Sequence, residues 1–388
     1  MPRKISLAAA GVLALASVSS DAAVLPYRFD KVAQHGPGFS GLGLPALNDS
    51  GVAAYAETRP DGSAGVFFGN HFGVQQVPTI PGGLQSGVDI NNAGQVAFAR
   101  TQAPPPGQAF GDEVVYRADP TGIVRIGSAF GVIEEDISAG PVVNNAGVVG
   151  FSTAATIQSR ALRGDGSGPP QIVGSSAGTI AGSGINNAGN LVYASISTGG
   201  TFVMYNARTV VAAANFGQST SFTDPDTGVT GPFTAIRSFD VGDNDRVAFG
   251  ARWNNLGDAI YLWENGALSR VAGTTGLTGV PAINDLGVVA GLVSGTGPTR
   301  LSIFEAGVEG TLISVGTPFD GSTVTGLNFS PEGFNNLNQV AFQAFLADGR
   351  TVNVIGQLPE PGAPATFLLA GTGFFARRRP RRLSDVGG

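Results

Sequence analysis

One short phrase recurs seven times along this sequence of 388 residues, and no other feature constrains the fold as strongly. Each copy opens with Asn-Asn, Asn-Asp or Gly-Asp, has Gly, Asp or Asn as its fourth residue, and continues into an apolar run. The copies are NDSGVAAY at 48, NNAGQVAF at 91, NNAGVVGF at 144, NNAGNLVY at 186, GDNDRVAF at 242, NDLGVVAG at 284 and NNLNQVAF at 335. Their starts lie 42 to 56 residues apart, and a period of this size indicates a solenoid, a propeller or another repeat array.

The phrase has the residues of a tight turn followed by a buried strand. Asn and Asp side chains hydrogen-bond to nearby backbone and open such a turn. The fourth position requires a positive φ, which Gly adopts without steric cost and which Asp and Asn tolerate better than most residues. The predicted turn residues are Asn48 and Gly51, Asn91 and Gly94, Asn144 and Gly147, Asn186 and Gly189, Asp245, Asn284 and Gly287, and Asn335 and Asn338.

Four short strands are predicted in each repeat. The second repeat contains them in QVAFAR (95–100), EVVYRAD (113–119), IVRIGSAFG (123–131) and GPVV (140–143), the last of which leads into the next turn. In a later repeat Asn265-Gly266 is a typical hairpin turn. Four antiparallel strands in each period of about 40 to 50 residues are the content of one blade of a β-propeller.

The two ends of the array complement each other. Residues 27–34 and 41–47 resemble third and fourth strands without their first two, whereas residues 339–346 and 349–357 resemble first and second strands. We therefore predict an all-β fold over residues 23–357, a seven-bladed β-propeller closed by N- and C-terminal strands. Short helical segments are expected at both termini. The structural alternative is an open β-solenoid, which needs capped ends.

Composition limits the classes of function. Gly accounts for 59 residues and Pro for 24, while charged residues make up 13%, as expected of short strands joined by turns and not of a disordered chain. There is no Cys, which excludes a disulfide framework, a thiolate metal site and a Cys nucleophile. The net charge of −6 disfavours a nucleic-acid partner, because such binding relies on Lys and Arg.

Few residues suggest catalysis. Ser176 in GSSAG matches the nucleophile string of hydrolases, but no helical pattern follows it. His35 and His71 lack the spacing of a zinc site, and the acidic stretches 224–226 and 243–245 lack that of a calcium-binding EF-hand. The repeated Asn side chains offer a ring of sugar-binding groups at one propeller rim, although turn formation is their first role. We predict no catalytic residue, metal or cofactor.

Residues 1–22 have the pattern of a secretory signal peptide. Arg3 and Lys4 precede an apolar stretch from Ile5 to Val18, and small residues lead to an expected cleavage after Ala22. The apolar stretch is shorter than a transmembrane helix requires. The chain is therefore expected to use the Sec export machinery.

Residues 358–388 contain three elements in a fixed order, which are a Pro-Glu-Pro triplet, an apolar segment and an Arg cluster. They comprise Pro359, Glu360 and Pro361, then residues 362–376, then Arg377, Arg378 and Arg379. Arginines that follow a short apolar segment reach the phosphate layer and keep their end of the segment in the cytoplasm. This segment is expected to hold the protein body transiently at the outer side of the inner membrane.

This tail resembles the PEP-CTERM sorting signal of Gram-negative bacteria that export polysaccharide. In that family an exosortase recognises the tripartite tail and cleaves near the triplet. The body, in phrases such as GINNAGNLVY and YLWENG, resembles the HAF-like Asn-x-x-Gly repeats of bacterial extracellular proteins. The resemblance implies an exported cell-surface or extracellular-matrix protein with an adhesive, scaffolding or exopolysaccharide-associated role. A propeller-type polysaccharide lyase or glycosidase is the alternative.

Overall fold

The computed structural model describes most of the chain between residues 23 and 357. The described ranges are 23–24, 27–38, 41–59, 61–78, 80–103, 112–119, 121–128, 135–137, 140–155, 158–214, 219–225, 228–254, 257–271, 280–295 and 297–357. The predicted signal peptide, the predicted sorting signal with its Pro-Glu-Pro triplet and Arg cluster, and the helical segments expected at the termini lie outside these ranges.

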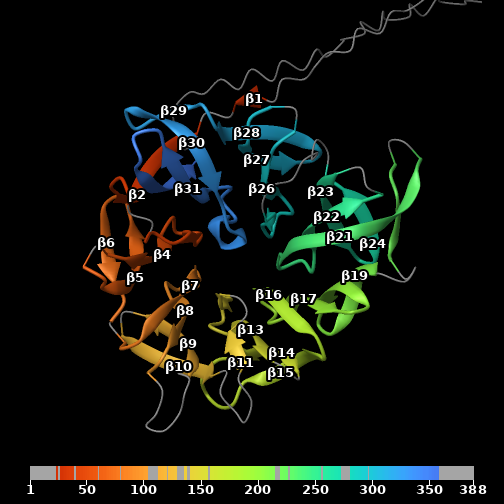
Figure 1. The fold of residues 1–388 in the computed structure, drawn as a ribbon, viewed down its shortest axis with the longest axis horizontal. Coiled ribbons are helices and arrows are strands. Elements are labelled where there is room, and N and C mark those ends of the chain that lie inside the picture. Colours follow the sequence, from red (N-terminus) through yellow and green to blue (C-terminus); the bar gives the residue numbers. More distant parts are fainter. Residues whose placement is uncertain are drawn as a thin grey trace, which may run out of the picture. The chain divides into compact units, whose positions relative to one another are not determined.

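The described strands form seven sheets arranged as blades around one axis (Figure 1). Blade 1 consists of β3 (Ala46–Leu47), β4 (Ala53–Thr58), β5 (Ala64–Asn70) and β6 (Gly73–Gln76). Blade 2 consists of β7 (Gly83–Ile90), β8 (Val96–Thr101), β9 (Glu113–Asp119) and β10 (Gly122–Ser128). Blade 3 consists of β11 (Glu135–Ile137), β12 (Val142–Val143), β13 (Val149–Ala155), β14 (Ser159–Gly164) and β15 (Gln171–Ser176).

The remaining four blades follow in chain order. Blade 4 consists of β16 (Thr179–Ile185), β17 (Leu191–Ser197), β18 (Gly200–Tyr205) and β19 (Arg208–Ala214). Blade 5 consists of β20 (Ser221–Thr223), β21 (Thr230–Val241), β22 (Val247–Trp253), β23 (Asp258–Glu264) and β24 (Ala267–Arg270). Blade 6 consists of β25 (Ala282–Ile283), β26 (Val289–Val293), β27 (Arg300–Glu305) and β28 (Val308–Ser314), with β1 (Ala23–Val24) added in parallel to β28. Blade 7 consists of β29 (Pro318–Phe319), β30 (Ser322–Asn328), β31 (Val340–Leu346), β32 (Thr351–Gln357) and β2 (Arg28–His35).

Blade 7 joins the two ends of the array. β2 pairs antiparallel with β32, from Arg28 opposite Gln357 to His35 opposite Thr351. Phe29 packs edge-on against Phe319 and Phe342, with ring centroids 5.9 and 6.0 Å apart. The predicted closed, seven-bladed propeller is confirmed, and the open β-solenoid is wrong.

The structure corrects the predicted grouping of strands. The sequence predicts residues 41–47 as the fourth strand of the closing blade, but β3 pairs with β4, with Ala46 opposite Ala54. The strand before each turn is therefore the innermost strand of the next blade, and the turn closes a hairpin inside that blade. Pairing across a tight turn costs less loop-closure entropy than pairing with a distant strand. In blade 7 the strand that precedes the turn is β30, which pairs with β31.

The core lies mainly between neighbouring blades. The eighth residue of the phrase is Phe or Tyr in six of the seven copies, and each of these rings is at most 3% exposed. They are Tyr55, Phe98, Phe151, Tyr193, Phe249 and Phe342. In one cluster, residues of blades 1 and 2 pack together, including Val66 and Phe98. The strand after each turn is thus covered on both faces, as its doubly apolar pattern predicts.

The fourth residue of every turn has a positive φ, whether or not it is Gly. The φ angle is 75° at Gly94, 59° at Asp245 and 57° at Asn338. A Cβ on Gly94 would have no heavy atom within 4 Å, so only the backbone conformation penalises a side chain there. We expect Gly94→Ala to lower the free energy of unfolding by about 1–2 kcal/mol, and Gly94→Asn to lower it by clearly less, in urea unfolding. Equal losses in the two variants would contradict a conformational role for Gly94.

Candidate functional site

The first Asn of a turn serves both its own turn and the next blade. The Asn144 side chain is buried, and its Oδ1 accepts the N–H groups of Ala146 and Val148 at 3.1 and 2.9 Å. Its Nδ2 donates to the carbonyl oxygen of Asn186 in the following blade at 3.0 Å. One side chain therefore stabilises a turn and also connects two blades.

Five such amide-to-carbonyl links connect successive blades. They run from Asn48 to Asn91, from Asn91 to Asn144, from Asn144 to Asn186, from Asn284 to Asn335, and from Asn335 back to Asn48. The series is interrupted at blade 5, where Gly242 replaces the first Asn. There the Nδ2 of Asn186 donates to Asp245 Oδ1 at 2.8 Å, and the Nδ2 of Asn244 donates to the carbonyl of Asp285 at 3.0 Å.

The second residues of the turns form a complete ring of hydrogen bonds. Each backbone N–H donates to the side-chain Oδ1 of the second residue in the next blade, over distances of 2.5 to 2.9 Å. The members in order are Asp49, Asn92, Asn145, Asn187, Asp243, Asp285 and Asn336, whose N–H donates to Asp49. Sequence reasoning missed this ring, although a repeated Asn or Asp at the second position was its signal.

The ring surrounds a small polar cavity of about 140 Å³ on the axis. Burial raises the pKa of Asp285, and the neighbouring Asp243 carboxylate raises it further against the opposing effect of the Asp243 N–H. Side-chain amides also engage these carboxylates, since Asn336 Nδ2 donates to Asp285 Oδ2 at 2.6 Å. The Asn and Asp side chains proposed as a sugar-binding rim are thus bonded to one another and to backbone.

An apolar collar lies directly beneath the ring. It consists of the residue before each turn, namely Leu47, Ile90, Val143, Ile185, Val241, Ile283 and Phe334. Ile185 is half-buried and the other six are at most 8% exposed. These side chains line the base of the polar cavity and close the axis at the face that carries the turns.

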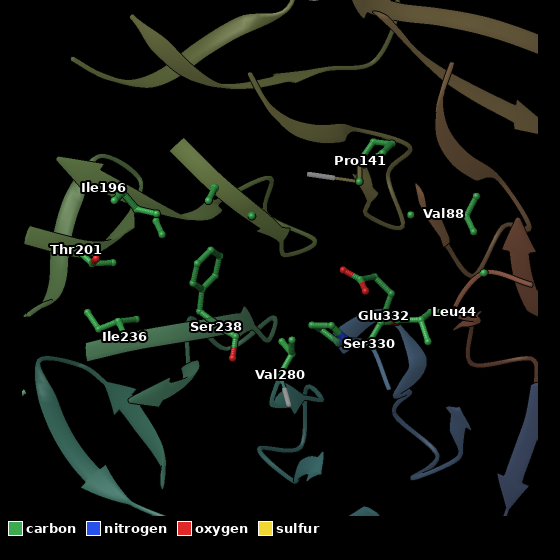
Figure 2. Close-up of a pocket in the computed structure, with 18 residues that line it drawn as sticks. Leu44, Val88, Pro141, Ile196, Thr201, Ile236, Ser238, Val280, Ser330 and Glu332 are labelled. Carbon is green, nitrogen blue, oxygen red and sulfur yellow. The ribbon is translucent and has the colours of Figure 1, made fainter. Parts of the chain in front are cut away.

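A larger cavity of about 500 Å³ lies on the axis and is lined by all seven blades (Figure 2). Most of its lining residues precede the collar by two to five positions along the innermost segments, so it lies on the other side of the collar from the ring. Most of them are apolar or Gly, including Val88, Pro141 and Phe239. The carboxyl group of Glu332, from the short 3-10 helix Pro331–Gly333, extends into the open centre of the cavity (Figure 2).

Two further carboxyl groups belong to Asp89 and Asp240, which directly follow the lining residues Val88 and Phe239. Asp89 accepts the N–H of Val143 in the next blade at 2.6 Å and that of Ile90 at 2.7 Å. Asp240 repeats the arrangement in blade 5, accepting the N–H groups of Ile283 and Val241 at 2.8 and 2.7 Å. Each of the two carboxyl groups therefore binds the backbone N–H groups of two collar residues.

Burial raises the pKa of all three carboxyl groups, those of Asp89, Asp240 and Glu332. It raises the pKa of Asp89 to about 8 and that of Asp240 to about 7. The negative charge of Glu332 raises both further, against the opposing effect of the backbone N–H groups. Burial also raises the pKa of Glu332. The axis therefore concentrates acidic groups in surroundings that disfavour their ionised form.

These shifts predict that the protein loses stability between about pH 4 and pH 8. A carboxyl group whose pKa is raised by folding binds more protons in the folded state across that window, so raising the pH favours unfolding. We expect the free energy of unfolding, from urea titrations, to be lower at pH 8 than at pH 5, and Asp89→Asn to reduce this difference. Asp61→Asn is the control, because Asp61 is exposed and its pKa is lowered, which confines its effect to lower pH. A pH difference unchanged by Asp89→Asn would contradict the assignment.

The other candidates from the sequence lie apart from the axial cavity. His35 contacts Glu57 at 3.1 Å and His71 contacts Arg28 at 3.4 Å. Ser176 ends β15 and accepts a hydrogen bond from Ser195 at 2.9 Å. Within the described ranges, no group of three or more His, Asp or Glu residues is arranged to hold a metal ion. No helix among the described residues is long and apolar enough to cross a bilayer.

Comparisons with known proteins give structural matches alone. No protein-family model matches this sequence, and no curated protein matches it. An acylaminoacyl peptidase of Pyrococcus horikoshii matches with a TM-score of 0.48 and 9% identity, over 79% of this chain and 50% of that one. The virginiamycin B lyase of Staphylococcus aureus matches with a TM-score of 0.46 and 12% identity, over 84% of this chain and 99% of that one.

A third match is TolB of Acinetobacter baumannii, with a TM-score of 0.38 and 12% identity, over 86% of this chain and 80% of that one. This chain spans half the length of the peptidase. Identities and TM-scores this low say nothing about the activity of the present chain.

Proposed function

We propose that this chain is an exported bacterial protein of the cell surface or extracellular matrix, whose propeller is a rigid scaffold associated with polysaccharide. The observation that carries the proposal is the use of the repeated turn residues. Asn144 and its equivalents, together with the closed ring of second residues, connect each blade to the next. The most repeated polar side chains of the sequence therefore connect the blades of the propeller, as expected of a scaffold.

The proposed route of export uses both ends of the chain. Sec machinery would recognise residues 1–22, and an exosortase would process residues 358–388 after transient retention at the inner membrane. In an exosortase-containing Gram-negative host, mass spectrometry of the released protein should locate one cut near residue 22 and another near Pro359-Glu360-Pro361. Glu360→Ala should leave the protein in the membrane fraction, whereas the control Asp385→Ala should be released. Release of both variants alike would contradict processing at the triplet.

Association with polysaccharide is tested separately with the purified protein. Exopolysaccharide of a PEP-CTERM-containing bacterium, immobilised on beads, should retain the full chain, and an unrelated dextran should not. The acidic net charge of −6 makes duplex DNA a suitable negative control. Equal retention by all three supports would contradict a specific polysaccharide partner.

The alternative of a glycosidase depends on two carboxyl groups that face one substrate. Among the described residues that line the axial cavity, Glu332 alone carries a carboxyl group. The carboxyl groups of Asp89 and Asp240 each accept hydrogen bonds from two backbone N–H groups. This arrangement favours binding over hydrolysis. Shortening of the exopolysaccharide by the protein, abolished in Glu332→Gln, would favour the enzyme instead.

A further inference from the structure

The axial cavity is a blind well with apolar walls and one acidic group at its centre. The collar closes it towards the turn face, and all seven blades contribute to its wall. We propose that this well binds an organic cation, a primary ammonium group carried by an apolar body. The proposal does not rest on the proposed route of export or on the proposed association with polysaccharide.

The charge of the well selects a cation. Glu332 extends into the cavity (Figure 2), and Asp89 and Asp240 directly follow the lining residues Val88 and Phe239. Among the described lining residues none is Lys, Arg or His. A carboxylate removed from water requires a compensating charge or hydrogen-bond donors. Ser330 donates one side-chain hydrogen bond to Glu332 but no charge. An ammonium group at Glu332 supplies the charge together with further, charge-assisted hydrogen bonds.

The apolar wall of the cavity favours a ligand that carries an apolar group next to its positive charge. Leu44, Val88, Ile236 and Phe239 come from three different blades and line the same cavity. Phe239 presents an aromatic ring, whose face also attracts a cation. The volume of about 500 Å³ lies within the range of small-molecule sites. A ligand with an aralkyl group could therefore bury the apolar surface of the cavity wall while its ammonium group contacts Glu332.

Other ligand classes fit the well less closely. An organic anion would find no Lys, Arg or His to pair with among the described lining residues and would face the Glu332 carboxyl group. A neutral saccharide requires several hydrogen-bonding groups around its hydroxyls, whereas the polar side chains lining the cavity are Thr201, Ser238, Ser330 and Glu332. One acidic group among apolar walls matches a ligand with one cationic end.

The test compares three probes of similar shape by isothermal titration calorimetry on the full chain at pH 8. They are 2-phenylethylammonium, the neutral 2-phenylethanol and the anionic 3-phenylpropionate. We expect the ammonium probe to bind at least tenfold more tightly than the alcohol, and the carboxylate not to bind measurably. Equal binding of the ammonium and the alcohol, preference for the carboxylate, or no binding of the ammonium would each overturn the proposal.

Two variants locate the binding in the well. Glu332→Gln should weaken the ammonium probe at least tenfold, while Asp61→Asn, which removes one exposed carboxylate, should leave it unchanged. Glu332→Lys places a cation beside Asp89 and Asp240 and should reverse the preference towards 3-phenylpropionate. Thermal unfolding of each variant verifies that it is folded. Unchanged ammonium binding in a folded Glu332→Gln variant would overturn the assignment of the site without affecting the proposed surface role.

Discussion

A chain that begins at Gly41, and so lacks β2 and the two-residue strand β1, is expected not to form a stable propeller. β32 would become an edge strand, although residues 351–356 of it are buried in the closed wheel. The Phe29 ring, which packs against Phe319 and Phe342, would also be lost. The combined loss should reach at least about 5 kcal/mol, comparable with the entire stability of many domains.

The measurement is thermal unfolding followed by circular dichroism, with a chain that begins at Ala23 as the control. The control retains β2 and should unfold cooperatively, whereas the shorter chain should show no cooperative transition or a much lower midpoint. A synthetic peptide of residues 23–40 added to the shorter chain should restore part of the transition, because it can pair with β32 in the native register. Unfolding midpoints within a few degrees of each other would show that closure contributes little.

Asn144→Ala is expected to lower the free energy of unfolding by about 3 kcal/mol. The buried amide makes three hydrogen bonds, two within its turn and one to Asn186 in the next blade, and each contributes on the order of 1 kcal/mol. Removing it leaves the N–H groups of Ala146 and Val148 without their acceptor, which adds to the cost when they stay buried. The Asn186 carbonyl still accepts the N–H of Gly189. Urea unfolding of the purified variant gives the value.

The neighbouring Asn145 is the matched control for Asn144. It has the same chemistry in the same turn, but it is exposed and its Oδ1 accepts one N–H, that of Asn92. Asn145→Ala should therefore cost about 1 kcal/mol or less. Similar losses in the two variants would mean that the buried amide does not hold the blades together as the structure implies.

Much of the fold was accessible from the sequence because its determinants are local. A positive φ at the fourth turn position follows from Gly94 and its equivalents, and from the choice of Asp245 and Asn338 where Gly is absent. The number of blades follows from the number of turns, and the closure follows from two half-repeats at the ends. Each of these depends on residues a few positions apart or on simple counting.

The grouping of strands and the axial cavity were not accessible in that way. Residues 41–47 could form a local hairpin with the strand that follows them or pair with the edge of a distant strand. The structure shows the local hairpin, in which β3 pairs with β4. Asp89, Asp240 and Glu332 belong to three different blades. Asp89 and Asp240 stand directly before the collar, where the other copies carry Ala, Val or Gly, and Glu332 stands one position earlier, where the others carry Pro, Val, Ser or Phe. No periodicity marks them as a group.

The sequence alone therefore determined the closed seven-bladed propeller, because the residues that form its turns recur at a nearly regular interval. Tertiary structure decided what lies at its axis, because closing the ring brings residues more than 90 positions apart into one buried space. Only there does burial act on three carboxyl groups together and raise the pKa of each. That joint effect is a property of the closed ring and of no single repeat.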